Sequence, residues 1–473
     1  MNSFRLKNMK SFIDSGEIKI KPITIFIGKN SSGKSSLVRF PIVLKQTMEE
    51  SISPLLFYGK YIDYGNYEDV VFDHKEKDDV FFKISMNISD IINVIGRPNG
   101  KYQGISKLKG LYKFLNKREK SDNEIIIDIQ VGRKLNRNRF YGELEIKRFE
   151  MNFEEEQIFC AKLKGDTYEC IFNNTFEKKV DLFFKGFIPN LIPISFDNDK
   201  LFDEELELLS DLLWVLDRYL SNTFSNVSYI GPFRRTPERN YRYQEASKLV
   251  IGSDGSYTSE LLASYHRKGD KKFFRELNNW LESHLNIHID VEDLKGGMYR
   301  IVVKDLQTGV ENNITDVGFG LSQVLPIIVQ VLQKNRGKER SYTSPMRDKA
   351  MNINIIEQPE LHLHPDAQSN LADLFIHGAA VNINNFFIVE THSEHLILRL
   401  RRRILEGTID SDKVAIYYVE RFDENKGSSV KELKIDSKGN IKDWPTDFFD
   451  QDYKEIMEIN KIKANNDKGE EEW

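Results

Sequence analysis

The residues best suited to chemistry form a glycine-rich segment near the start of the chain. It reads Gly28-Lys29-Asn30-Ser31-Ser32-Gly33-Lys34-Ser35-Ser36 and fits the pattern G-x-x-x-x-G-K-S. Gly28 and Gly33 allow the backbone to turn so that successive N–H groups approach a polyphosphate. Lys34 is expected to reach the β- and γ-phosphates, and Ser35 to place its hydroxyl on Mg²⁺. A chance match in a glycine-rich turn is the alternative to this predicted nucleotide site.

A second candidate group follows the apolar run Ile353-Asn354-Ile355-Ile356. This run predicts a strand that ends in Glu357-Gln358-Pro359-Glu360. Ligands of parallel sheets bind at the carboxyl ends of the strands, so an acid there is directed at the metal held by Ser35. We expect Glu357 to hold Mg²⁺, directly or through water. A strand end capped by a solvated acid is the alternative.

Two further motifs lie on either side of that strand in the sequence. Asp316-Val317-Gly318-Phe319-Gly320 opens a segment with apolar residues at helical spacing, and a helix N-terminus attracts anions. Phe386-Phe387-Ile388-Val389 predicts a strand that ends in Glu390-Thr391-His392-Ser393. His392 could therefore hydrogen-bond the γ-phosphate or the water that attacks it.

Hydrophobic patterns predict the elements that must position these motifs. The strand Ile23-Thr24-Ile25-Phe26-Ile27 precedes the glycine-rich segment, and Leu37, Phe40 and Leu44 lie on one face of the helix after it. From about residue 80 to residue 194, short stretches alternate apolar with polar residues, as half-exposed antiparallel strands do. The strands expected there are Val80–Met86, Ile125–Ile129, Tyr141–Ile146 and Tyr168–Phe172.

Other segments complete the expected framework. Two short strands are expected within residues 1–20, with a turn at Asp14-Ser15-Gly16. A helix is expected over Asp203–Phe224. The strand Val227–Ile230 then leads into Gly231-Pro232-Phe233-Arg234-Arg235. Its two arginines could bind a nucleotide phosphate, or equally an acidic surface.

Composition limits the class of protein. The 473 residues are 40% hydrophobic and 30% charged, with a net charge of −5. Such a chain suits two or three globular domains, and its charge gives no overall attraction to nucleic acid. The two cysteines, Cys160 and Cys170, fit a reduced cytosol, and we see no apolar signal core or membrane-length apolar run. We therefore expect a cytoplasmic protein without membrane contact.

Four motifs together carry a resemblance to a known family. Taken in chain order, Gly28 to Ser35, Gly318 to Gly320, Glu357 to Pro365 and Glu390 to Ser393 resemble the ABC-type P-loop ATPase heads of the SMC/RecF/OLD-like class. The third motif, E-x-P-E-x-x-L-H-P, is typical of OLD-like prokaryotic ATPases. The chain after His392 is too short for the TOPRIM nuclease module of OLD enzymes, so none is expected.

Two further segments resemble a subfamily that ends in a small domain of unknown function. They are Tyr229 to Arg235, and Gly439 to Pro445 followed by Phe448-Phe449-Asp450. The resemblance implies an α/β fold, an ABC-type head with a mixed central sheet, flanking helices and a β-rich antiparallel insertion. The implied division is residues 1–80 and 226–410 for the head, 81–225 for the insertion, 411–460 for the small C-terminal domain, and 461–473 for an acidic flexible tail.

The resemblance also implies Mg²⁺-dependent ATP hydrolysis. Two heads of a homodimer, or of a higher oligomer, would sandwich ATP between the P-loop of one copy and Gly318–Gly320 of the other. Lys34 and Ser35 would bind phosphate and Mg²⁺. Glu357 would take the Walker B acid role and His392 the switch-histidine role.

The chain departs from this family at the catalytic position. Gln358 stands where many ABC ATPases have the glutamate that activates water, and glutamine cannot accept a proton. Glu360 could substitute, or hydrolysis is slow and the ATP-bound dimer is long-lived. We expect slow turnover. In addition, Gly318 stands where the signature serine is usual, and no obvious glutamine supplies the metal-contacting loop after the P-loop helix.

The expected function is an ATPase whose dimerisation controls a partner effector, such as a nuclease, in a prokaryotic anti-phage system. That step rests on family analogy. The alternative is a RecF/SMC-like DNA-binding ATPase in repair or maintenance. Its candidate contacts are the Lys/Arg-rich segment between Lys107 and Arg139 and four arginines after His392, which could equally form the solvated side of a helix. These arginines are Arg399, Arg401, Arg402 and Arg403. A transporter subunit is a third class, which the β-rich insertion does not suit.

Overall fold

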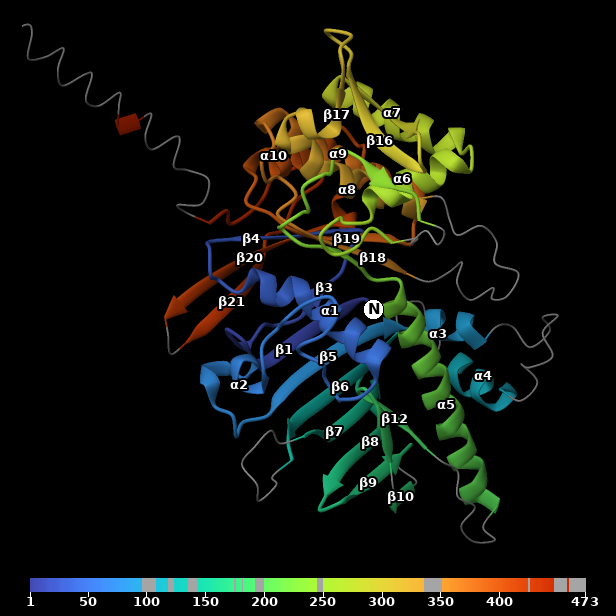
Figure 1. Cartoon of the computed structure of the whole chain (residues 1–473). Coiled ribbons are helices and arrows are strands. Elements are labelled where there is room, and N and C mark those ends of the chain that lie inside the picture. Colours follow the sequence, from blue (N-terminus) through green and yellow to red (C-terminus); the bar gives the residue numbers. More distant parts are fainter. Residues whose placement is uncertain are drawn as a thin grey trace, which may run out of the picture.

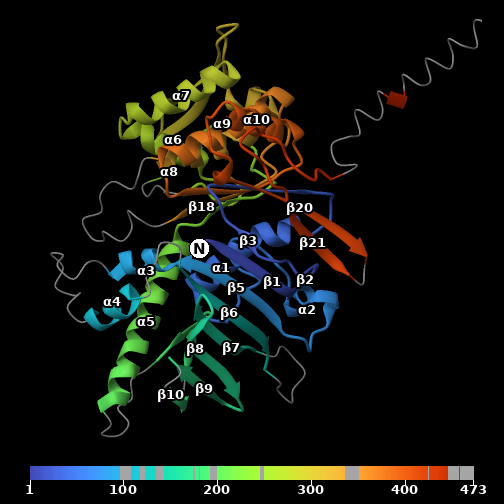
Figure 2. The same cartoon turned by 180° about the vertical axis from the view of Figure 1, so that it is seen from behind.

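The computed structural model describes residues 1–95, 108–117, 123–134, 143–173, 176–180, 182–191, 200–244, 250–335, 351–423, 426–445 and 457–458. These residues form an α/β fold with a largely parallel central sheet, flanking helices and antiparallel strands, which confirms the expected fold class. A large antiparallel sheet lies on one side of the central sheet and a helical lobe on the other (Figures 1 and 2). The expected tail at 461–473 and Phe448 to Asp450 lie outside the described residues.

The central sheet positions the candidate motifs. Within the described residues it has six strands in the order β13-β18-β19-β4-β20-β21, and neighbours run parallel except for β20 and β21. All six residues of β4 are buried, as in a parallel strand that is covered on both faces. The carboxyl ends of β4, β18 and β19 therefore meet at one edge. The bounds are β4 Ile23–Gly28, β13 Ser228–Ile230, β18 Asn352–Glu357, β19 Asn385–Glu390, β20 Val414–Asp423 and β21 Gly427–Glu432.

Helices cover both faces of this sheet (Figure 1). The helix α1 lies between it and the large antiparallel sheet, while α8, α9 and α10 lie on the opposite face. Side chains of β4 alternate between two cores, because Ile23, Ile25 and Ile27 pack with α9 and α10 and Phe26 packs with α1. The bounds are α1 Lys34–Glu50, α8 Phe319–Asn335, α9 Pro365–Val381 and α10 Glu394–Leu405.

The large antiparallel sheet joins the N-terminal strands to the region expected as an insertion. In the described part of the chain it has nine strands in the order β10-β9-β8-β7-β6-β5-β1-β2, with β3 paired to β1. Phe4 of β1 pairs with Ile84 of β5. The same sheet therefore contains strands from both sides of residue 80, where we expected a domain boundary. The bounds are β1 Ser3–Met9, β2 Phe12–Asp14, β3 Ile18–Lys19, β5 Val80–Asn87, β6 Glu124–Arg133, β7 Leu144–Phe153, β8 Glu156–Lys164, β9 Thr167–Phe172 and β10 Phe176–Val180.

Most of the elements expected here are present. The four expected strands correspond to β5, β6, β7 and β9, although Tyr141 and Gly142 lie outside the described residues. The expected helix over 203–224 is α5. Residues 1–20 form three strands rather than the two expected, because an additional turn at Lys10 separates β1 from β2. Lys10 has a φ of 54°, a conformation more usual for glycine or asparagine, so its sequence gave no turn signal.

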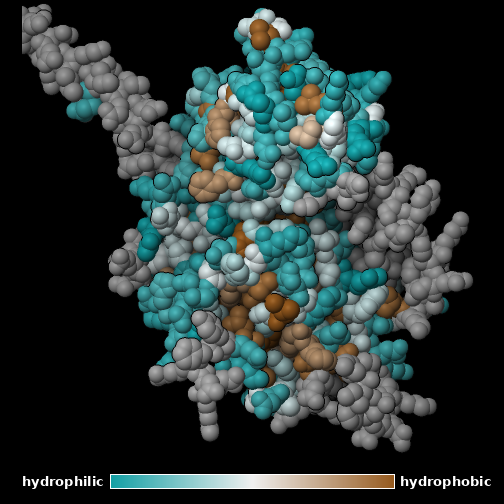
Figure 3. Space-filling model, in the orientation of Figure 1, coloured by the Kyte–Doolittle hydropathy of each residue, from teal (hydrophilic) through white to brown (hydrophobic). Residues whose placement is uncertain are grey.

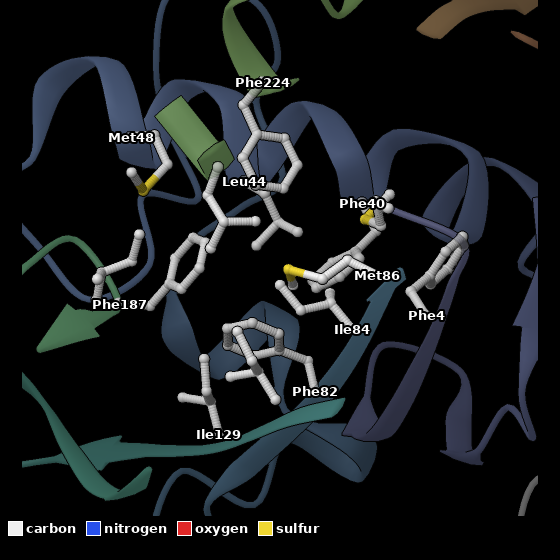
Figure 4. Packing of buried hydrophobic residues seen from close by; sticks show 14 of the residues in the cluster. Phe4, Phe40, Leu44, Met48, Phe82, Ile84, Met86, Ile129, Phe187 and Phe224 are labelled. Atoms are coloured by element: carbon white, nitrogen blue, oxygen red, sulfur yellow. The ribbon is translucent and has the colours of Figure 1, made fainter. Parts of the chain in front are cut away.

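A group of aromatic side chains joins α1 to the antiparallel sheet (Figure 4). Phe40 of α1 contacts Phe4 of β1 and Phe82 of β5, with ring centroids 5.7 and 5.5 Å apart. Phe187 packs edge-on against Phe82 at 5.5 Å and lies 6.3 Å from Phe224 near the end of α5. Such pairs contribute about 0.5–1.5 kcal/mol each beyond their burial. The helix that follows the glycine-rich segment is thereby fixed to both sheets.

The helical lobe carries a small antiparallel sheet made of β14 to β17. Figure 3 shows mostly polar side chains over this lobe and more apolar ones on the lower half of the molecule. Among the described residues, no helix is long and apolar enough to cross a membrane. The remaining bounds are β11 Phe183–Lys185, β12 Ile188–Asn190, β14 Tyr241–Arg242, β15 Ile287–Leu294, β16 Met298–Asp305, β17 Glu311–Asn313, α2 Tyr67–Val70, α3 Ile88–Ile95, α4 Lys109–Asn116, α5 Lys200–Ser225, α6 Thr258–Arg267, α7 Lys271–Leu285, η1 Phe72–His74, η3 Ile314–Asp316 and η5 Ser411–Lys413.

Candidate functional site

The glycine-rich segment forms a tight loop between β4 and α1. Gly28 ends β4 with a φ of 149°, and Gly33 precedes α1 with a φ of 100°. A Cβ at Gly28 would overlap the carbonyl oxygen of Val419 in β20, and a Cβ at Gly33 would overlap the hydroxyl of Ser11. Only glycine fits either position without displacement of a neighbour. The two glycines of the motif are therefore required by the packing of the loop as well as by its turns.

Lys34 holds its ammonium group over this loop. Its Nζ donates hydrogen bonds to the carbonyl oxygens of Gly28, at 3.0 Å, and Lys29, at 2.7 Å. Burial lowers the pKa of Lys34, while the charges of Glu390 and Glu360 oppose that shift. Phosphate oxygens would make stronger partners than neutral carbonyls for this cation. The position of Lys34 thus suits the phosphate-binding role expected from the sequence.

The other residues of the glycine-rich loop differ in their exposure to solvent. Lys29, Asn30 and Ser31 are exposed, and Ser31 has a φ of 61°. Ser32 is buried, and its hydroxyl has no hydrogen-bond partner among the described residues. The N–H of Ser36 is used in the first turn of α1. A polar ligand bound in this loop could supply the hydrogen-bond partner that the buried hydroxyl of Ser32 lacks.

Ser35 contacts an acid at the end of the neighbouring strand. Its Oγ donates a hydrogen bond to Oε1 of Glu390 at 3.0 Å. The other oxygen of Glu390, Oε2, is buried and has no hydrogen-bond partner among the described residues. Burial, together with the nearby charge of Glu357, raises the pKa of Glu390 to about 7. Glu390 was not among the residues expected to bind the metal, although it ends a strand in the same way as Glu357.

Glu357 lies at the same edge but has different partners. It is registered opposite Glu390 in the parallel pair of β18 and β19. Arg39 of α1 donates hydrogen bonds from Nε and Nη2 to its two oxygens, both at 2.6 Å. Tyr229 of β13 donates a third, at 2.9 Å. We expected Glu357 to face Ser35, and the structure instead pairs Ser35 with Glu390.

The segment after β18 is held by a buried arginine. Gln358 has a φ of 45°, and its N–H donates to the carbonyl oxygen of Glu390 at 2.7 Å. Arg234 donates to the carbonyl oxygens of Gln358, at 3.0 Å, and of Glu357, at 2.6 Å. Burial lowers the pKa of Arg234 to about 10. Of the two arginines we considered for a phosphate or an acidic surface, Arg234 is therefore used inside the fold, while Arg235 is exposed and paired with Glu238 at 2.7 Å.

Glu360 ties this segment to the residues after β19. Its Oε2 accepts a hydrogen bond from the hydroxyl of Thr391 at 2.8 Å, and its Oε1 accepts one from the N–H of His392 at 2.6 Å. Burial raises the pKa of Glu360, against these bonds. Burial, with the nearby charge of Lys34, lowers the pKa of His392 to about 4. A neutral His392 can thus donate or accept a hydrogen bond close to the ammonium of Lys34.

The glycine pair at the start of α8 lies beside the segment after β18. A Cβ at Gly320 would lie 2.6 Å from the carbonyl oxygen of His362, which shows how closely the two backbones approach. The ring of Phe319 packs edge-on against His362, with centroids 4.9 Å apart, yet 47% of Phe319 is exposed. Gly318 faces open space. The N-terminus of α8 therefore presents an open surface.

Two family descriptions match parts of the chain. Residues 244–397 match an AAA ATPase domain, and residues 409–459 match a protein of unknown function, DUF3696. The first match contains the Gly318, Glu357 and His392 motifs, while the glycine-rich loop lies outside it. This match supports an ATP-binding ATPase. The chain matches no curated protein.

Two solved structures are similar over most of their length. The SMC head domain from Thermotoga maritima has 11% sequence identity and a TM-score of 0.39, with 92% of this chain and 99% of that chain covered. An SMC head domain with an extended coiled coil, bound to the C-terminal domain of ScpA and derived from Pyrococcus furiosus, has 12% identity and a TM-score of 0.40, with 97% and 99% covered. At this distance neither similarity bears on function.

Proposed function

We propose that this chain binds ATP with Mg²⁺ where β4, β18 and β19 end, hydrolyses it slowly, and joins a second copy in the ATP-bound state. The observation that carries the proposal is the contact of Ser35 with Glu390, at 3.0 Å and across 355 residues of sequence. This contact sets a phosphate-type loop beside buried acids. Lys34 and the loop amides suit a triphosphate, and the hydroxyl and carboxylates suit its metal.

The residues present fit Mg²⁺. In nucleotide sites this ion is held by a loop hydroxyl, one or two carboxylates, water and phosphate oxygens. Ser35 supplies the hydroxyl, and two carboxylates, Glu390 and Glu357, lie at the same edge of the sheet. The buried and unpartnered Oε2 of Glu390 is the kind of oxygen that a cation would satisfy. Once bound, the ion would neutralise charge on the phosphates.

The arrangement favours slow hydrolysis. Gln358 cannot accept a proton, so it can position a water molecule without acting as a general base. Glu360 is a weak substitute, because each of its oxygens already accepts a hydrogen bond from Thr391 or His392. His392 suits a hydrogen bond to the γ-phosphate or to water. A long-lived ATP-bound state is the consequence.

The open N-terminus of α8 supports a site completed by a second copy. Gly318, Phe319 and Gly320 lie on the helical lobe, and Phe319 is partly exposed. In the head dimers that the sequence resembles, the corresponding residues close over the nucleotide of the partner. A homodimer or higher oligomer held together by ATP would place these glycine N–H groups on phosphate.

We further propose that the ATP-bound assembly controls a partner effector, such as a nuclease, in a cytoplasmic anti-phage system. This step rests on the family resemblance. The DNA-binding alternative has less support at α10, because three of the four arginines proposed there make bonds to other parts of the fold. Arg399 and Arg403 pair with Asp373, and Arg401 donates to the carbonyl oxygen of Gly439. Part of the basic segment between Lys107 and Arg139 lies outside the described residues.

Lys34→Ala tests the proposal. Because Lys34 is the cation of the loop, its removal should weaken ATP affinity at least about tenfold and abolish assembly that depends on ATP. Isothermal titration with ATP and light scattering with and without ATP measure the two effects. Unchanged ATP affinity would count decisively against the proposed site.

Lys45→Ala is the matched control. Lys45 is another buried lysine of α1, but its Nζ contacts the carbonyl oxygens of Phe224 and Ser225, away from the loop. We expect this variant to lose stability while its ATP affinity stays that of the wild type. An equal loss of affinity in both variants would indicate a general effect on the helix.

A further inference from the structure

Two buried glutamates lie at the proposed site, and their surroundings differ. Glu357 ends β18 and Glu390 ends β19, and the two are direct partners in the register of the sheet. Glu357 is 2% exposed and Glu390 is 3% exposed, so neither can draw on bulk water. Two buried carboxylates side by side repel each other unless a basic side chain or a cation compensates one of them, or one of them takes up a proton.

Glu357 already has this compensation. Arg39 binds both of its oxygens at 2.6 Å, in the two-pronged arrangement that suits a guanidinium and a carboxylate. The hydroxyl of Tyr229 adds a third hydrogen bond at 2.9 Å. A metal ion that took Glu357 would have to displace these bonds and leave Arg39 without its partner, which is costly for a partly buried charge.

Glu390 lacks it. Its Oε1 accepts a single hydrogen bond, from the hydroxyl of Ser35, and its Oε2 has no hydrogen-bond partner among the described residues. Lys34 lies close enough to interact with Glu390 electrostatically, yet its Nζ bonds carbonyl oxygens of the loop. The carboxylate beside the loop hydroxyl is therefore the one with an unused, buried oxygen.

We propose that Glu390, at the end of β19, is the carboxylate that holds Mg²⁺ beside Ser35, and that Glu357 remains the partner of Arg39. This inference rests on the proposed function. It assigns the metal of that site to Glu390, whereas the sequence pattern had led us to expect Glu357. Glu357 then stabilises the site through Arg39 and contacts the metal at most through water.

Glu390→Gln and Glu357→Gln form a matched pair, because both remove one buried charge from neighbouring strand ends and keep the side-chain size. Mn²⁺ serves as the probe, and its free fraction is followed by electron paramagnetic resonance. The titration is made on the full chain saturated with a non-hydrolysable ATP analogue. We expect Glu390→Gln to weaken Mn²⁺ affinity about tenfold or more and Glu357→Gln to weaken it less than about threefold. The reverse order, equal losses, or no loss in either variant overturns the inference.

Binding of the analogue in EDTA separates this inference from the proposed function. If the wild type binds the analogue but Glu390→Gln keeps normal Mn²⁺ affinity, the inference fails and the ATP site stands. If the wild type binds no analogue even when Mg²⁺ is present, both fail. If Glu390→Gln does not fold, Glu390→Asp replaces it in the test. The shorter aspartate keeps the negative charge but moves the carboxylate oxygens away from the proposed metal position beside Ser35. Wild-type Mn²⁺ affinity in Glu390→Asp then overturns the inference.

Discussion

Single residues at the strand ends are strongly affected by burial. The pKa of Glu390 rises to about 7, because its carboxylate is buried and lies near Glu357. The pKa of His392 falls to about 4, because the ring is buried and lies near Lys34. Both shifts favour the neutral form of the side chain.

A glutamate at position 358 should raise the turnover of the enzyme. Gln358→Glu introduces a proton acceptor of similar size at the position where many of the ABC-type ATPases that the sequence resembles have their catalytic glutamate. General-base catalysis contributes roughly 100-fold or more, so we expect at least about a tenfold rise in kcat. Phosphate release under saturating ATP measures it.

Gln358→Ala is the control for this substitution, and it should show no such rise. Unchanged kcat in Gln358→Glu, with ATP affinity intact, would mean that proton transfer does not limit the reaction.

Among the elements, α9 and α10 are joined by a partly buried ion cluster. Asp373 of α9 bonds Arg399 of α10 at 2.6 Å and Arg403 of the same helix at 2.6 Å. The side chain of Asp373 is only 13% exposed. Burial would raise the pKa of Asp373, but Arg403 and Arg399 hold it below its usual value. The cluster fixes α10, the helix that directly follows His392.

Asp373→Asn should destabilise the protein in a way that depends on pH. Because folding lowers the pKa of Asp373, its carboxylate stabilises the folded state above the unfolded value of 3.8, and that contribution is lost as pH falls through the lower folded pKa. We expect the free energy of unfolding to fall by about 1–3 kcal/mol at pH 7. Urea denaturation measures it, and the difference from wild type should shrink toward pH 3.

Asp366→Asn supplies the comparison for that measurement. Asp366 is exposed in the first turn of α9, where a charge contributes about 0.3–1 kcal/mol. A loss in Asp373→Asn that was no larger than this, or that did not change with pH, would contradict the role of the cluster.

The elements were predictable where the signal is local, and their contacts were not. The strand Ile23–Ile27, the loop and α1 follow from residues that are neighbours in sequence. The same holds for the strands that end in Glu357 and Glu390. The partner of each acid depends on register and on helix rotation, and Arg39 lies 318 residues from Glu357. Hydrophobic periodicity does not report such a pairing, and the two strand ends look alike in sequence. The sequence therefore could not show which of the two acids lies beside Ser35.

For the molecule as a whole, one core extends from the antiparallel sheet through α1 to the central sheet. It contains Phe4, Phe40, Phe187 and Phe224 together with Ile355 of β18. The region expected as an insertion therefore shares its interior with α1, the helix that follows the glycine-rich loop. We infer that the antiparallel sheet and α1 unfold together rather than separately.

Phe187→Ala should destabilise this shared core. The ring is fully buried between Phe82 and Phe224, so its loss should lower the free energy of unfolding by about 3–5 kcal/mol, measured by chemical denaturation. Phe183→Ala, four residues earlier and 56% exposed, should change it by less than about 0.5 kcal/mol. Similar effects of the two substitutions would contradict the assignment of Phe187 to the core.

The position of β4 has a consequence for synthesis. This early strand lies between β19 and β20, which belong to the last part of the described chain, and the carbonyl oxygen of Val419 packs against Gly28. During synthesis, the glycine-rich loop emerges from the ribosome well before either of the strands that flank β4. The packing of Val419 against Gly28 therefore forms only after β20 has been translated, and the ATP site that we propose is complete only then.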